Sequence, residues 1–268
     1  MACNETLYAI REVADLTGVK PVTLRAWQRR YNLIQPQRTD KGHRLYTPED
    51  VERINTIQGW LSKGVSIGKV KSLLDSDTLS QASVDTDQLE EVSEMLDALS
   101  HLNGNKIDKI LDTVLKEYPL DIVESKFVVP VLNAAEFLKV GPKAIQLSLF
   151  RTSLVQKLAV MSTLDSKRKK SETVLFVSMD VAGNPFAWLS YAKLAEQGVS
   201  VTFLDGVEDL SVLQSDPSSF GSVQLFAEKS LSEKQLESIR IQREKGGVVW
   251  KLSPVIEHLL EEKESTET

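Results

Sequence analysis

The segment that decides the fold reads Lys20-Pro21-Val22-Thr23-Leu24-Arg25-Ala26-Trp27-Gln28-Arg29-Arg30-Tyr31. Proline is well tolerated in the first turn of a helix, so a helix is predicted to begin near Lys20 or Pro21. Residues 11–17 predict a shorter helix before it, and Gly18 follows where a helix end favours a left-handed residue. Two short helices joined by a turn of about three residues form the helix-turn-helix pattern.

The second of these helices is predicted to have two different faces. We expect Val22 and Trp27 to point inward. We expect the opposite face to carry Thr23, Arg25, Gln28 and Arg29. An α-helix fits the major groove of DNA, where base edges present distinct donors and acceptors. The polar face therefore predicts contacts with DNA, and the alternative is a solvated surface on a small helical domain.

A short hairpin and a sharply capped helix follow. Asp40-Lys41-Gly42 predicts a tight turn in the segment 38–46, because Gly42 can adopt positive φ. Thr47 is predicted as the N-cap of the next helix, with Pro48 at its first position. A further short helix is predicted after Ser66. Residues 1–75 therefore predict a winged helix-turn-helix domain.

Charge is distributed unevenly along the 268 residues, whose formal net charge is −6. Residues 1–75 hold 12 lysines and arginines against 8 acidic residues, and the rest of the chain holds 20 against 30. A basic head and an acidic body favour one domain that touches phosphates and another that does not. The single cysteine, Cys3, argues against a disulfide framework and suits a reducing cytoplasm. No apolar run approaches the roughly 20 residues that cross a bilayer, so no membrane association is expected.

The rest of the chain predicts a linker and two further domains. Residues 76–88 are rich in serine, threonine and aspartate and predict a linker. Residues 89–170 carry four helical patterns with short connections, which favour a four-helix bundle. The third of these helices is expected to bend at Pro130. Residues 171–268 alternate short apolar runs with helical patterns, which predicts a Rossmann-like parallel α/β domain. The acidic tail 261–268 is expected to fray.

The head resembles that of the MerR family of transcription regulators. The resemblance rests on residues 8–14, on Thr23-Leu24-Arg25 and on Gly42-His43-Arg44-Leu45-Tyr46. It implies a dimer or higher oligomer on near-palindromic promoter DNA, distortion of the spacer and engagement of RNA polymerase. It implies DNA contacts by Arg25, Arg38, His43 and Arg44. Together with Thr23 and Arg29 from the polar face of the helix, these are the predicted DNA-binding positions.

The order of the three domains also resembles the cobalamin-binding, light-responsive regulators within this family. Those proteins mark their ligand site with a tryptophan and a Glu-His pair in the bundle, and with Glu-x-His in the first loop of a B12-binding α/β domain. The aligned positions here are Leu138, Ser148, Leu149, Val181 and Gly183. Imidazole ligates the cobalt, and neither serine nor glycine replaces it. The resemblance is therefore to the cobalamin-independent branch, which includes regulators of curli and biofilm genes, and no cofactor or metal is expected.

Three alternatives remain open for the acidic body. The segment 180–185 follows a predicted strand, where α/β folds usually bind ligands, so a different small molecule is one possibility. An ordinary strand-to-helix turn is the simpler interpretation. The body is otherwise a signal-integration module whose main partner is a regulatory protein. As a function for the whole chain, an enzyme ranks third, after a transcription regulator and a signal-integration module. No nucleotide-binding glycine motif or catalytic triad is evident, and a cobalamin mutase relative would keep the histidine.

Overall fold

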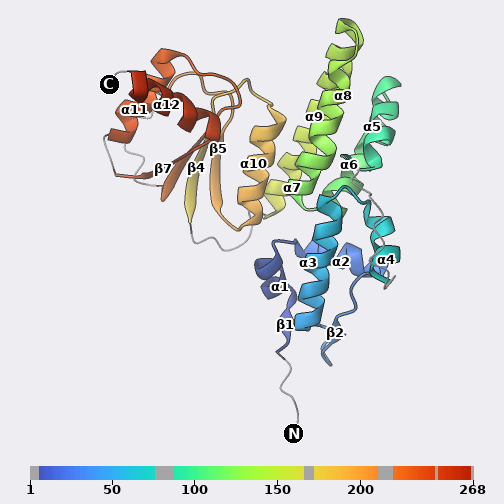
Figure 1. Ribbon diagram of the computed structural model, residues 1–268. Coiled ribbons are helices and arrows are strands. Elements are labelled where there is room, and N and C mark those ends of the chain that lie inside the picture. Colours follow the sequence, from blue (N-terminus) through green and yellow to red (C-terminus); the bar gives the residue numbers. More distant parts are fainter. Residues whose placement is uncertain (1–5, 76–86, 166–171, 211–219, 245–246, 267–268) are drawn as a thin grey trace. The chain divides into compact units, whose positions relative to one another are not determined.

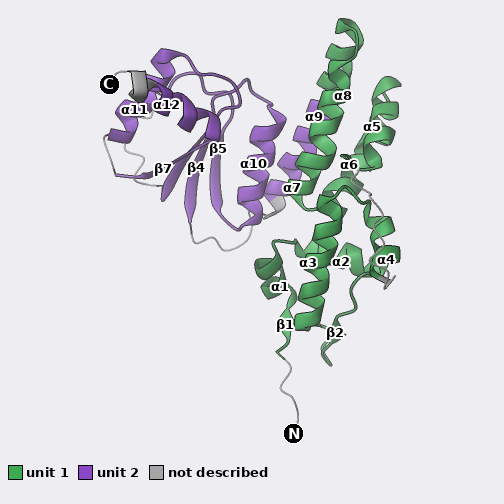
Figure 2. Ribbon diagram, viewed as in Figure 1, with its two compact units in different colours: residues 1–150 green, residues 151–268 purple. Residues whose placement is uncertain are grey.

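The computed structural model describes residues 6–75, 87–165, 172–210, 220–244 and 247–266. The chain divides into two compact units, Met1–Phe150 and Arg151–Thr268 (Figures 1 and 2). Most of the predicted linker 76–88 lies outside the described residues. None of the described helices combines the length and the apolar character that crossing a membrane requires. The finer division at 75, 88 and 170 stays a prediction.

The first part of unit 1 contains the predicted pair of helices, the hairpin and the capped helix. Its elements are β1 (Tyr8–Ala9), α1 (Ile10–Thr17), α2 (Pro21–Ala26), the π-helical turn η1 (Trp27–Tyr31), β2 (Gln37–Arg38), β3 (Arg44–Tyr46), α3 (Pro48–Ser62) and α4 (Ile67–Asp75). Gly18 ends α1 with a φ of 71°, as predicted. Buried Trp27, Ile54 and Ile57 belong to the apolar core of this region.

The hairpin is part of a three-stranded antiparallel sheet ordered β1-β3-β2. Gly42 has a φ of 78° and donates its N–H to the carbonyl of Thr39, so it forms the tight turn that the sequence predicts. Strand β1 was not predicted, because two residues are too short to show an alternating pattern. The sheet therefore joins the hairpin to the strand that leads into α1.

Helix α3 begins as predicted, with a capping box. The hydroxyl of Thr47 accepts the N–H of Asp50, and the Asp50 carboxylate accepts the N–H of Thr47. These two bonds satisfy backbone donors that the first turn of a helix leaves without partners. Pro48 occupies the first turn. The hairpin and α3 are thus joined in a defined direction.

The predicted orientation of Val22 and Thr23 is wrong. Val22 is 45% exposed, whereas Thr23 is 0% exposed and its hydroxyl has no hydrogen-bond partner among the residues that the structure describes. At 3.6 residues per turn, Val22 and Trp27 lie about 140° apart around a helix and Thr23 and Trp27 only about 40° apart. The buried face therefore contains Thr23, Leu24 and Trp27.

The second part of unit 1 is helical. Its elements are α5 (Glu91–Ser100), α6 (Gly104–Glu117), α7 (Leu120–Val123), the π-helical turn η2 (Glu124–Val128), α8 (Val129–Glu136) and the first part of α9 (Val140–Asp165), which continues into unit 2. The predicted apolar stripe of α6 is buried, including Ile107, Leu111 and Val114.

Pro130 interrupts the third helical pattern, as its chemistry predicts. Proline has no N–H for the carbonyl four residues earlier, which belongs to Lys126. That carbonyl accepts the N–H of Leu89 instead, at 2.9 Å. The π-helical turn η2 ends two residues before Pro130. The irregular turn therefore also anchors the segment that leads into α5.

Unit 2 contains a four-stranded parallel sheet ordered β5-β4-β6-β7. Its elements after α9 are β4 (Thr173–Ser178), α10 (Pro185–Glu196), β5 (Ser200–Leu204), β6 (Ser222–Phe226), α11 (Glu233–Glu244), β7 (Val249–Leu252) and α12 (Pro254–Thr266). The parallel α/β arrangement confirms the prediction.

Helices cover both faces of this sheet (Figure 1). Alternate residues of β4 point to opposite faces, as in any strand. Val174 and Phe176 pack with Ala187 of α10. Leu175 and Val177 pack with residues of α11 and α12, including Ile239 and Ile256. Helix α12 was not predicted, and residues 261–266 are helical where fraying was expected.

Candidate nucleic-acid interface

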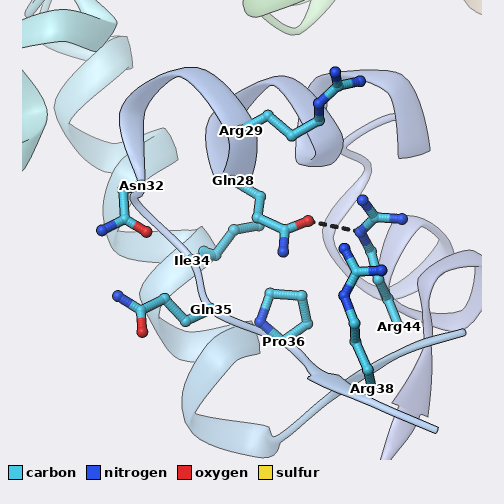
Figure 3. Close-up of a pocket in the computed structure, with 8 residues that line it drawn as sticks. All are labelled: Gln28, Arg29, Asn32, Ile34, Gln35, Pro36, Arg38 and Arg44. Atoms are coloured by element: carbon cyan, nitrogen blue, oxygen red, sulfur yellow. Dashed lines mark hydrogen bonds between the residues drawn. The ribbon is translucent and has the colours of Figure 1, made fainter. Parts of the chain in front are cut away.

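A hollow of about 680 Å³ opens between the second helix and the hairpin (Figure 3). Gln28 and Arg29 border it from η1, and Arg38 and Arg44 border it from β2 and β3. The connecting segment completes the lining with Asn32, Ile34, Gln35 and Pro36. The eight lining residues include three arginines and no carboxylate. An anionic ligand therefore meets only cationic and neutral groups here.

The local backbone explains how the helix and the hairpin come together. Asn32 ends η1 with a φ of 52°, a left-handed conformation that asparagine tolerates better than most residues. The chain then buries Leu33 and Ile34. Arg53 of α3 donates to the carbonyl of Leu33. These contacts direct the segment after the helix toward the hairpin and leave the hollow between them.

One hydrogen bond joins the two sides of the hollow. Nε of Arg44 donates to Oε1 of Gln28 at 2.6 Å. Burial raises the pKa of Tyr46, and the positive charges of Arg44 and Arg25 oppose that shift. Both arginines therefore lie close enough to act on the same buried phenol.

Five of the six predicted DNA-binding residues belong to this surface. Arg29, Arg38 and Arg44 line the hollow, whereas Arg25 and His43 are exposed outside it. Within the described parts of the chain, no ion pair is found for Arg25, Arg29 or Arg38. Thr23 is fully buried and offers no surface to a base in this conformation.

Sequence reasoning missed Gln28 and Asn32 as lining residues. Gln28 was expected on the outward face of the helix, but its bond with Arg44 joins residues 16 positions apart and leaves no local pattern. Asn32 follows the helix and ends it with a left-handed backbone. In the sequence, this role is indicated only by the tolerance of asparagine for that conformation. Both residues add amide groups to a surface otherwise rich in guanidinium.

None of the five positions aligned with a cobalamin site carries an imidazole. Leu138, Ser148 and Leu149 lie in unit 1, and Ser148 is exposed on α9. In unit 2, Val181 is 78% exposed after β4. Gly183 has a φ of 81°, a conformation in which a histidine side chain would be strained.

The loop after β4 is hydrogen-bonded to residues that follow β5 and β6. Gly183 donates its N–H to Oδ2 of Asp205 at 2.9 Å, and the indole N–H of Trp188 donates to the same oxygen at 2.9 Å. The side-chain amide of Asn184 donates to Asp180 and Glu228 at 3.0 Å each. Asn184 also caps α10. The loop is therefore held by its own neighbours at the carboxyl edge of the sheet.

Comparison with known proteins identifies the class. The model of the MerR HTH family regulatory protein matches residues 8–77. The HTH-type transcriptional regulators MlrA of Salmonella typhimurium (strain LT2) and of Escherichia coli (strain K12) are each 32% identical to this chain, over 74% of its length and 79% of theirs. The HTH-type transcriptional repressor CarH of Myxococcus xanthus is 39% identical over 70 residues, 26% of this chain and 23% of its own.

The chain belongs to the MerR family of transcription regulators, of the MlrA type. DNA-binding regulation of transcription is thereby established as its class of function. The relatives are named as regulators of transcription, and this confirms the prediction that the chain is not an enzyme.

Proposed function

We propose that the chain binds promoter DNA as a dimer or higher oligomer, through a winged helix-turn-helix surface. The helix contributes Arg25, Gln28 and Arg29, and the wing contributes Arg38, His43 and Arg44. The observation that carries this proposal is the convergence of three arginines on one hollow without a carboxylate. Thr23 is left out of the surface because its side chain is buried.

The helix and the wing have different tasks in this proposal. Arg25 and Gln28 read base edges in the major groove, where arginine and glutamine make bidentate contacts with guanine and adenine. Arg38 and His43 contact phosphates or a neighbouring groove from the wing. Phosphate contacts set the register without reading the sequence. As in the family, the bound chain is proposed to distort the spacer DNA so that RNA polymerase can engage the promoter.

The body is proposed to combine a four-helix bundle, within residues 89–170, with a B12-binding-like α/β domain, residues 171–268, that does not bind cobalamin. Its closed loop at the carboxyl edge of the sheet supports this interpretation. The same closure favours a protein partner over a small molecule as the source of the signal. The body is then the sensory and interaction part of the regulator.

The test is the affinity of single variants for a duplex that the wild-type chain enriches from a random-sequence pool. Arg25→Ala and Arg44→Ala should each weaken binding by about 1–3 kcal/mol while leaving the fold intact. Arg151→Ala, at an exposed position of α9, is the matched control and should bind as the wild type does. Unchanged affinity in both head variants would reject the proposed surface.

A further inference from the structure

Glu117 is a buried acid outside the surface described above. It is the last residue of α6 and is 1% exposed. Removing a carboxylate from water is costly unless the group is paired and hydrogen-bonded. The partners of Glu117 therefore show which groups compensate for the burial of its carboxylate.

All three of those partners come from the second helix of the head. The guanidinium of Arg30 pairs with Oε1 of Glu117, and the hydroxyl of Tyr31 donates to Oε2. The indole N–H of Trp27 donates to the backbone carbonyl of Glu117 at 2.8 Å. One residue thus binds three of the five residues of the turn η1, at separations of 86–90 positions in the chain.

The protonation of Tyr31 suits this arrangement. Burial raises the pKa of Tyr31, and the hydrogen bond to Glu117 raises it further. The phenol therefore keeps its proton at neutral pH and remains a donor to the carboxylate. Arg30 is always charged under such conditions.

The residue that follows α6, Tyr118, anchors another helix of the head. The hydroxyl of Tyr118 accepts the N–H of Ile67, at the start of α4, at 3.3 Å. It donates to Oε1 of Glu91, at the start of α5, at 2.8 Å. The end of α6 is therefore attached to both η1 and α4, and a shift of α6 moves the head at two points.

The turn held by Glu117 also carries the residues that face the hollow. Gln28 and Arg29 lie in η1 between Trp27 and Arg30. Arg29 lines the hollow, whereas its neighbour Arg30 is paired with Glu117. Because a turn of helix is stiff, fixing three of its residues also fixes the direction of the other two.

We propose that Glu117 is a positioning residue for DNA recognition, through which the helical region of unit 1 holds Gln28 in register with base edges and Arg29 beside it on the DNA-binding surface. This inference rests on the proposed function and extends it. The helical region sets DNA affinity by keeping or releasing this contact. No residue of α6 needs to touch DNA for this effect.

The experiment compares two DNA probes with the full-length chain. One is the duplex enriched by the wild type, and the other is a random-sequence duplex of the same length. The variants are Glu117→Gln, which removes the charge and one acceptor, Tyr31→Phe, which removes one donor, and the two combined. Glu94→Gln, an exposed carboxylate of α5, is the matched control. Circular dichroism sets a temperature at which the variants compared are fully folded.

We expect Glu117→Gln to weaken binding to the enriched duplex about five- to tenfold and to change random-duplex binding little, because a charged hydrogen-bonded pair is lost. If Glu117 positions the DNA-reading residues, the ratio of the affinity for the enriched duplex to that for the random duplex should fall. A loss of active protein would instead reduce the apparent affinity for both duplexes equally. The double variant should lose less than the product of the single losses. If Glu117→Gln does not fold, a reduced ratio in Tyr31→Phe carries the test.

Two results would overturn the inference. One is an unchanged ratio of affinities in the folded variants, and the other is tighter binding to the enriched duplex. A wild-type chain that enriches no duplex would instead reject the proposed function itself. The two failures are therefore distinguishable.

Discussion

Arg44 of β3 donates a hydrogen bond from Nε to Oε1 of Gln28 in η1, at 2.6 Å (Figure 3). This bond joins the two elements that are proposed to meet DNA. It also leaves the terminal nitrogens of Arg44 with no bond to Gln28. Gln28 is therefore placed to orient an arginine as well as to contact a base.

A double-mutant cycle tests that relationship. Gln28→Ala should weaken binding to the enriched duplex, because Arg44 loses its orienting partner. Arg44→Ala should weaken it more, since the cation itself is lost. The combined variant should lose less than the sum of the two single losses, because residues in one hydrogen-bonded unit are not additive. Losses that simply add would mean that Gln28 and Arg44 act independently.

Local signals were sufficient to predict the framework of the head. The Thr47 cap, the left-handed Gly18 and the turn at Gly42 each follow from the chemistry of a few adjacent residues. The parallel sheet was predicted from short apolar runs that alternate with helical patterns. These features depend on contacts over a few positions, which periodicity and turn composition report.

The remaining features depend on contacts that local patterns do not contain. In the sequence, Glu117 has the pattern of an ordinary polar residue at the end of an amphipathic helix. Its partners lie 86–90 positions away in the chain. The outward assignment of Thr23 failed because Val22 was paired with Trp27 across an interval that does not fit a helical turn. The closed loop after β4 depends on Asp205 and Glu228, which follow other strands.

The pH dependence of the free energy of unfolding should reveal the raised pKa of Glu91. Burial raises the pKa of this carboxyl above its ordinary value of 4.5. Within the described parts of the chain, its Oε2 has no hydrogen-bond partner. A raised pKa means that the folded chain binds the proton more tightly than the unfolded chain. The resulting stabilisation is fully present below the unfolded pKa and is lost as the pH rises through the folded pKa.

Glu91→Gln keeps an acceptor for the hydroxyl of Tyr118 and removes the charge. Its free energy of unfolding relative to wild type should therefore rise as the pH increases from about 4.5, by at most about 1.4 kcal/mol per pH unit. Urea unfolding of the full chain at a series of pH values measures this difference, with Glu94→Gln as the exposed control. A difference that is constant with pH would show that burial does not perturb Glu91.

A visible absorption spectrum tests the lost cobalamin site. We expect the full-length chain, incubated with several cobalamins in the dark and then dialysed, to be colourless. The aligned loop carries Gly183 in place of an imidazole, and its N–H is already bonded to Asp205. A cobalamin spectrum retained after dialysis, and absent from a dialysed mixture without the chain, would contradict the assignments of Ser148, Leu149 and Gly183. Light or vitamin status would then become the leading signal.

The closure of the carboxyl edge of the sheet can be tested with two glycines of unit 2. Gly206 and Gly198 have φ values of 75° and 78°, so alanine is strained at either position. A Cβ at Gly206 would also lie 2.9 Å from Cβ of Ala182, whereas one at Gly198 would meet nothing within 4 Å. The two substitutions therefore differ in the contact with the loop after β4.

We expect Gly206→Ala to destabilise β4 and β6 by about 1–3 kcal/mol more than Gly198→Ala, measured by hydrogen exchange of their amides in the full chain. Adding Ala182→Gly should recover part of that difference, because it removes the nearest atom of the clash. Such a recovery would show that the additional destabilisation arises where the loop after β4 contacts the loop after β5. This is the contact that closes the carboxyl edge of the sheet. Equal losses in the two alanine variants would mean that the loop after β4 moves aside at little cost. The edge of the sheet would then be open to a ligand, and the preference for a protein partner would lose its support.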